Sequence, residues 1–111
     1  MAWLLRDDDV VVALEVATGF GARLRGLLGR DGVEGAILLR PAKSVHTFGM
    51  RFPIDVAFCD RDLRVIAICS LKPNRITRMR WRANAVIEAE AGAFARWRLA
   101  VGDELRVEGV P

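Results

Sequence analysis

Short apolar runs alternate with turn-forming residues along most of this chain, a pattern that is typical of β-strands. The clearest hairpin is predicted around the polar turn Asp60-Arg61-Asp62, because strongly β-prone runs lie on both sides of it. The expected strands or extended segments are residues 10–16, 35–39, 44–50, 54–59, 63–71, 84–90 and 104–107. Alternation within 84–90 places Val86, Glu88 and Glu90 on one face.

One segment has helical spacing instead. After Thr18, which can cap a helix, apolar residues recur every three or four positions with arginines on the other side, and this predicts a short amphipathic helix near residues 19–29. A single helical turn is expected at 94–97, after Gly92. One helix among six or seven strands indicates an α+β, β-rich fold, either a curled antiparallel or mixed sheet or a small barrel-like core.

Length and composition predict one domain over residues 1–111, since 52% hydrophobic residues are enough for a core. No apolar run approaches the roughly 20 residues that span a bilayer. The N-terminus also lacks the apolar stretch of about 7–15 residues found in a signal peptide. We therefore expect a cytoplasmic protein, with a leader removed upstream as the open alternative. Oligomeric state is left undetermined.

Cys59 and Cys69 are the only cysteines. If the hairpin is centred near residues 60–63, Cys69 lies opposite about Ile54, and this arrangement leaves the two sulfurs too far apart for a disulfide. Both cysteines lie in apolar strand patterns, so we interpret them as small core residues.

His46, the only histidine, begins the most unusual stretch of the sequence, which ends at Asp55. Its ordinary pKa near 6.5 suits a proton carrier or a metal ligand, and the alternative is a ring packed in the core. Asp55 interrupts an apolar strand, so it must be exposed or hydrogen-bonded. It is a candidate to orient His46, to accept hydrogen bonds from a backbone loop, to bind Arg51 or another arginine, or to tie down the turn around Pro53.

Further candidates lie around this stretch. The full set of candidate ligand-binding residues is His46, Met50, Asp55, Ser44, Thr47 and Glu88. In an extended segment Ser44 shares a side with His46, so it is a more reachable nucleophile than Thr47. No nucleophile elbow and no phosphate-cradling loop accompany the pair. Glu88 and Glu90 either flank a groove or lie in solvent, and exposure is the commoner arrangement.

Metal chemistry is limited by the supply of ligands. One histidine and two dispersed cysteines do not make the three or four ligands of a zinc site. A copper(I) site from His46, Met50 and a cysteine is chemically permissible. We expect no metal and no cofactor.

The net charge of +3 is unevenly distributed, because four arginines fall within residues 75–82 among Ile76, Met79 and Trp81. Such a stretch can contact an anion or nucleic-acid phosphates. It can equally be a loop or edge strand with solvated arginines. No recognisable nucleic-acid motif accompanies it.

Four stretches in matching order resemble the DUF192 family, a set of small, mostly prokaryotic proteins of the UPF0127 type. They are residues 17–18 with 23–30, residues 44–50 with 52–58, residues 86–92 and residues 102–103. The second, which contains His46-Thr47-Phe48-Gly49-Met50, is the most specific, although many members have a tryptophan- and asparagine-containing version. Many members also carry an export or lipoprotein signal, and we expect none for this chain. The resemblance implies a compact β-rich fold and no established activity.

Taken together, the residues favour a small non-catalytic domain that binds a ligand or partner near residues 46–55. A small anionic ligand or an acidic protein would suit the charge. The alternative is an enzyme that uses His46 as general acid or base with Asp55 as its orienter. A third hypothesis is an assembly partner with exposed Trp3, Trp81 or Trp97 as anchors.

Overall fold

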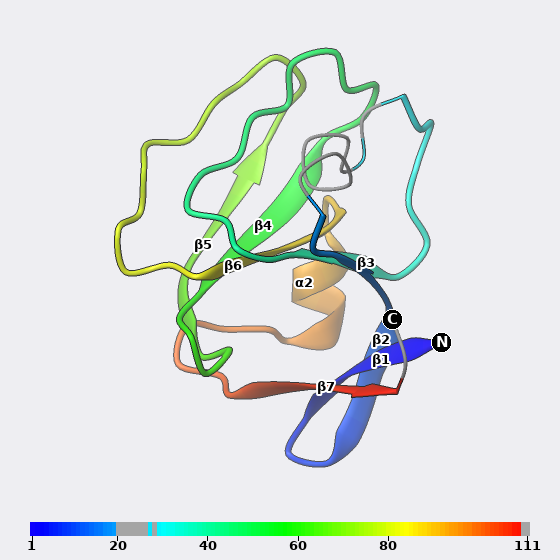
Figure 1. Cartoon of the computed structure of the whole chain (residues 1–111). Helices are drawn as coiled ribbons and strands as arrows, with labels where there is room; N and C mark the ends of the chain where they lie inside the picture. Colours follow the sequence, from blue (N-terminus) through cyan, green and yellow to red (C-terminus); the bar gives the residue numbers. More distant parts are fainter. Residues whose placement is uncertain (20–26, 28, 110–111) are drawn as a thin grey trace.

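The computed structural model describes residues 1–19, 27 and 29–109, and this part of the chain forms one seven-stranded sheet with one short helix. The elements are β1 (Ala2–Arg6), β2 (Asp9–Ala17), β3 (Ala36–Leu39), β4 (Ile54–Cys59), β5 (Val65–Leu71), β6 (Ala85–Glu90), α2 (Ala93–Trp97) and β7 (Leu105–Gly109). The strand order is β5-β4-β6-β3-β2-β1-β7 (Figure 1). The helix predicted near residues 19–29 lies outside the described residues, apart from positions 19, 27 and 29.

The sheet is mixed, as predicted, because β2 and β3 run parallel whereas the other neighbouring strands are antiparallel. Gly35 leads into β3 with a φ of +80°, and a side chain there would collide with the carbonyl oxygen of Ala13 on β2. Glycine is the residue that permits both the dihedral angle and this close approach. The sequence pattern does not predict β1, which becomes a strand because β2 and β7 pair with both of its edges.

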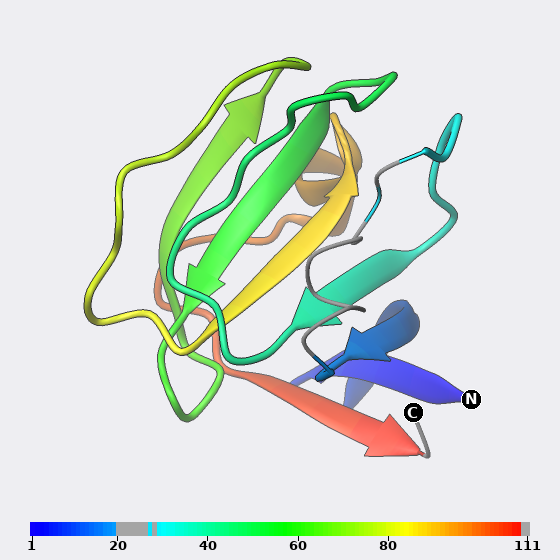
Figure 2. The same cartoon turned by 45° about the horizontal axis from the view of Figure 1, so that its top comes forward.

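The sheet curls without closing into a barrel. Its two edge strands come together at one end, where Arg64 and Glu104 form an isolated bridge and the amide of Val65 donates to the carbonyl of Asp103 at 2.9 Å. The curl creates an inner face, which packs against Phe94 of α2, and an outer face, which packs against side chains from residues 42–52. Figure 2 shows α2 on one side of β4 and β6 and the segment 42–53 on the other.

The hairpin predicted around residues 60–62 is present as β4 and β5, but its predicted register is wrong. Cys69 pairs with Val56 and not with Ile54, because the turn pairs Cys59 with Val65, one position later than predicted, and a bulge at Phe58 and Cys59 then inserts an extra residue on β5. Both cysteines are free, as expected. Burial raises the pKa of the Cys59 thiol to about 12, so this thiol is an unreactive core group.

Candidate functional site

The predicted extended segment 44–50 is fastened to the arginine-rich segment by Thr47. Its amide donates to the carbonyl of Arg75 at 2.7 Å, and its hydroxyl donates to the carbonyl of Lys72 at 2.6 Å and accepts from the amide of Arg75 at 2.9 Å. The side chain is fully buried. Thr47 was a candidate ligand-binding residue, and the structure shows its hydroxyl bonded within the protein.

Two loops that are separate in the sequence therefore form one unit, made of residues 43–51 and 72–83. His46 and Ile76 form an antiparallel bridge, the amide of Thr77 donates to Val45 at 2.8 Å, and the amide of Arg80 donates to the carbonyl of Lys43 at 2.8 Å. Figures 1 and 2 show the two segments side by side. We call the solvent-exposed side of this pair the loop surface.

Large apolar side chains are exposed on the loop surface. Trp81 is 76% exposed, Ile76 66%, Phe48 49% and Met79 46%. His46 is also exposed and stacks on Phe48 with a ring separation of 5.4 Å. Several large apolar side chains exposed on two adjoining segments are a feature that interaction sites often have. The prediction that His46 packs in the core is wrong, because the 44–50 segment turns alternate side chains outward, Ser44 and His46 among them.

The two segments carry only positive charges. They contain seven of the 17 Lys and Arg residues and none of the 14 Asp and Glu residues. The rest of the chain has ten basic and 14 acidic residues, a net charge of −4. Among the described residues, Lys72, Arg75, Arg78 and Arg82 form no salt bridge. The surface is therefore cationic and apolar at once, with no carboxylate of its own.

Asp55 lies on the inner face of β4 and holds the start of α2. Its carboxylate accepts hydrogen bonds from the hydroxyl of Ser70 at 2.7 Å and from the amides of Gly92 at 3.0 Å and Phe94 at 3.1 Å. Gly92 has a φ of 95°, which brings both amides toward one oxygen. Of the roles predicted for Asp55, the structure shows the acceptor of backbone hydrogen bonds.

The same geometry separates Asp55 from the other candidates. His46 belongs to the loop that covers the outer face, and no hydrogen bond in the described part of the chain joins it to Asp55. Arg51 pairs with Asp31 at 2.8 Å. The structure therefore gives Asp55 no orienting role toward His46 and no contact with Arg51.

Met50 and Glu88 lie on the outer face. Met50 is buried in the cluster that covers β3, β4 and β6. Glu88 is on β6 between Ile37 and Val56, and its carboxyl is nearly enclosed without a hydrogen bond to any described residue. Burial raises its pKa to about 7. Solvent exposure was expected for both glutamates, and the structure shows it only for Glu90.

Replacing Thr47 with valine should destabilise the protein by about 2 kcal/mol, because three backbone groups lose a buried partner while the volume is kept. Urea unfolding measures the change. Amide exchange should accelerate at Arg75, whose amide loses its acceptor. Ser44→Ala is the matched control, since Ser44 is exposed, and it should change stability by less than about 0.5 kcal/mol. Equal effects of the two substitutions would contradict the fastening role.

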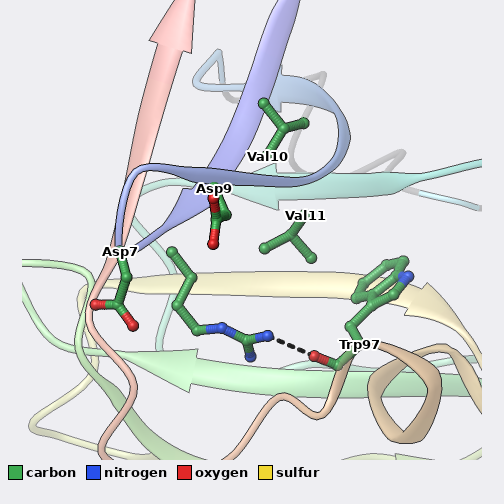
Figure 3. Close-up of a pocket in the computed structure, with 6 residues that line it drawn as sticks. Asp7, Asp9, Val10, Val11 and Trp97 are labelled. Carbon is green, nitrogen blue, oxygen red and sulfur yellow. Dashed lines mark hydrogen bonds between the residues drawn. The ribbon is translucent and has the colours of Figure 1, made fainter.

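A pocket that the sequence did not predict lies between the β1–β2 turn and α2 (Figure 3). It has a volume of about 240 Å³. Its lining residues are Arg6, Asp7, Asp9, Val10, Val11 and Trp97. The Arg6 guanidinium donates to the carbonyl of Trp97 at 2.6 Å and to Asp103 at 3.0 Å. This cation therefore ties β1 to the end of α2. In the sequence, the run of three aspartates at residues 7–9 is the feature that could have pointed to this pocket, because two of them line it.

The described residues show neither a cluster of metal ligands nor a membrane-spanning helix. No group of three or more His, Cys, Asp or Glu side chains is placed to hold a metal ion. No helix in this part of the chain has the length and apolar character needed to cross a membrane.

Comparison with known proteins matches residues 3–107 to the DUF192 family, described as Uncharacterized ACR. UPF0127 protein PH1112 of Pyrococcus horikoshii is 30% identical over 98 residues, covering 84% of this chain and 85% of the relative. A similar protein of Pyrococcus abyssi is 30% identical over 97 residues, covering 83% of each chain.

Two crystal structures share the fold. A protein of unknown function from Novosphingobium aromaticivorans has a TM-score of 0.77 and 19% identity, covering 95% of this chain and 82% of its own. A candidate transcription regulator from Sinorhizobium meliloti has a TM-score of 0.78 and 19% identity, covering 96% and 91%. At this identity the likeness concerns the fold alone. The family match spans nearly the whole sequence, and the chain therefore belongs to the DUF192 family of uncharacterised proteins.

Proposed function

We propose that this domain is a non-catalytic binding module that engages an acidic protein partner through the loop surface. The observation that carries the proposal is charge segregation: seven cations and no acid lie in the two segments that also expose Phe48, Ile76, Met79 and Trp81. The four of these cations that form no salt bridge in the described part of the chain, Lys72, Arg75, Arg78 and Arg82, attract an acidic surface at long range. Exposed aromatic and aliphatic side chains supply the area that is buried on contact.

A protein suits this surface better than a small anion does. The pocket at the β1–β2 turn shares no residue with the loop surface, and two acids line it. The four apolar side chains of the loop surface stand out from the protein, as anchors of a protein interface do. The arginines around them supply a polar rim whose attraction weakens with salt.

The enzymatic alternative has less support. His46 stacks on Phe48 in an exposed position, and three donors already occupy the Asp55 carboxylate. A general base held by an orienting carboxylate needs the two groups within hydrogen-bond reach. We therefore assign His46 to the binding surface.

The test uses a glutamate-rich peptide containing two leucines as the probe, with binding followed by isothermal titration calorimetry. We expect the triple variant Arg75→Glu, Arg78→Glu, Arg82→Glu to bind at least about 100-fold more weakly, since like charges then face each other. The matched control is Arg61→Glu, Arg64→Glu, Arg96→Glu. It changes the net charge equally at exposed sites outside the loop surface and should bind within about threefold of the unmodified protein.

Three outcomes of this experiment would overturn the proposal. The first is equal loss in both triple variants, because general charge attraction would then be responsible. The second is unchanged binding after Trp81→Ala, since Trp81 is the most exposed of the four apolar anchors. The third is tighter binding of oligo(dT) or of phosphatidylglycerol vesicles than of the peptide, which would replace the acidic protein by a nucleic acid or a membrane.

A further inference from the structure

Glu88 is an acidic side chain in an apolar environment. It lies on β6 with Ile37 of β3 on one side and Val56 of β4 on the other. The residue two positions earlier on the same face, Val86, belongs to the outer apolar cluster. Glu88 itself is only 5% exposed.

No described group neutralises this carboxyl. On and above the outer face, Arg30 pairs with Glu15, Arg51 pairs with Asp31, and Arg80 lies against the Phe58 ring. The next acid on its own strand, Glu90, is exposed. An unpaired buried carboxylate reduces stability, and a valine would fit the same strand pattern without that penalty. Unpaired buried polar groups of this kind concentrate where a protein binds or reacts.

The outer apolar cluster beside Glu88 includes side chains that do not come from strands. Met50 and Phe52, from the loop between β3 and β4, pack on the same cluster. Methionine is flexible and fills irregular space, so the packing around Met50 can adjust its shape. The carboxyl of Glu88 is not completely sealed. Among the described residues, Arg80 Nε is the one fully enclosed side-chain polar atom without a hydrogen bond, so the unbonded oxygens of Glu88 must keep a small accessible area.

We propose that Glu88 anchors a small organic cation, a primary ammonium or guanidinium group on a short hydrocarbon chain. The charged end pairs with the carboxylate, and the hydrocarbon contacts Met50 and Ile37. A charge-assisted hydrogen bond in a poorly solvated site is strong, so the cation supplies the partner that no described residue provides. The same carboxylate excludes anions.

The probe is n-butylammonium chloride, titrated at pH 8 into isotope-labelled protein and followed by NMR. We expect saturable shifts at residues 37, 50, 56 and 88 with a dissociation constant of about 1 mM or tighter. Glu88→Gln should weaken binding at least about tenfold, since it removes the charge and keeps the shape. Glu90→Gln, on the same strand and face, is the matched control and should bind within about twofold of the unmodified protein.

A dependence on pH and on ligand charge distinguishes a cation site from an apolar cavity. Because burial holds the pKa of Glu88 near 7, affinity should fall about tenfold from pH 8 to pH 6, where a proton competes with the cation. 1-Butanol binding as tightly as n-butylammonium would show an apolar cavity only. Equal loss in the Glu88 and Glu90 variants, or no saturation in the unmodified protein, would also overturn the assignment. The arginine triple variant of the loop surface should bind n-butylammonium normally, so this test is independent of the proposed function.

Discussion

Replacing Glu88 with glutamine should make the protein progressively more stable, relative to the unmodified protein, as the pH rises. We expect the difference in unfolding free energy between the variant and the unmodified protein to be about 3 kcal/mol larger at pH 8 than at pH 4. Burial raises the folded-state pKa of Glu88 from 4.5 to about 7. Glutamine has no charge to lose, so any constant cost of burying its amide cancels in the comparison between the two pH values.

The sign follows from proton binding. Between about pH 4.5 and 7 the folded protein holds a proton on Glu88 that the unfolded chain has released. Folding is therefore favoured below pH 4.5, and this contribution is lost as the pH rises through 7. Chemical unfolding at several pH values measures it, with Glu90→Gln as the exposed control. A pH-independent difference for Glu88→Gln would show that its carboxyl is solvated or paired.

Replacing Asp55 with alanine should destabilise the protein by about 4 kcal/mol, the largest loss we expect from a substitution of a polar side chain. Three hydrogen bonds to a buried carboxylate disappear, and the amides of Gly92 and Phe94 are left without their acceptor. Each hydrogen bond to a charged group contributes about 1.5–3 kcal/mol. Bonds that share one carboxylate contribute less to stability together than the sum of their separate values. Urea unfolding measures the loss.

Ser70→Ala provides the matched control, because it removes only the side-chain donor to Asp55 and should cost about 1 kcal/mol. Amide exchange gives a second readout. In Asp55→Ala the amides of Gly92 and Phe94 should exchange faster, and in Ser70→Ala they should not. If both substitutions had the same small effect, α2 would depend on its packing alone.

The sequence predicted the elements that depend on neighbouring residues. The β4–β5 hairpin follows from two β-prone runs around a polar turn, and the α2 turn follows from Gly92. It predicted less where distant segments meet. β1 is a strand because β2 and β7 pair with it, and the Cys69 register depends on a bulge that no residue pattern announces.

The candidate site divides in the same way. The sequence singled out the stretch from His46 to Asp55 and the arginine-rich stretch separately, and the structure joins His46 to Ile76 while placing Asp55 on the opposite face. The positions of these two stretches in the sequence do not indicate that they lie side by side. Thr47 makes the connection through its amide and its hydroxyl, but its partners are backbone groups of Lys72 and Arg75. Almost any residue can supply such backbone groups, so the side chains of the partner segment carry no signal for it.

Glu88 shows most clearly what each level determines. The sequence by itself determined the strand alternation, so Glu88 and Glu90 had to share a face, and it determined that the chain belongs with the DUF192 family. Only the tertiary structure decided that one glutamate is buried and the other exposed. The physical reason is that alternation sets the direction of a side chain, whereas burial depends on the segments that pack against that face, and the apolar cluster around Glu88 includes Met50 and Phe52, which lie more than 30 residues away in the chain.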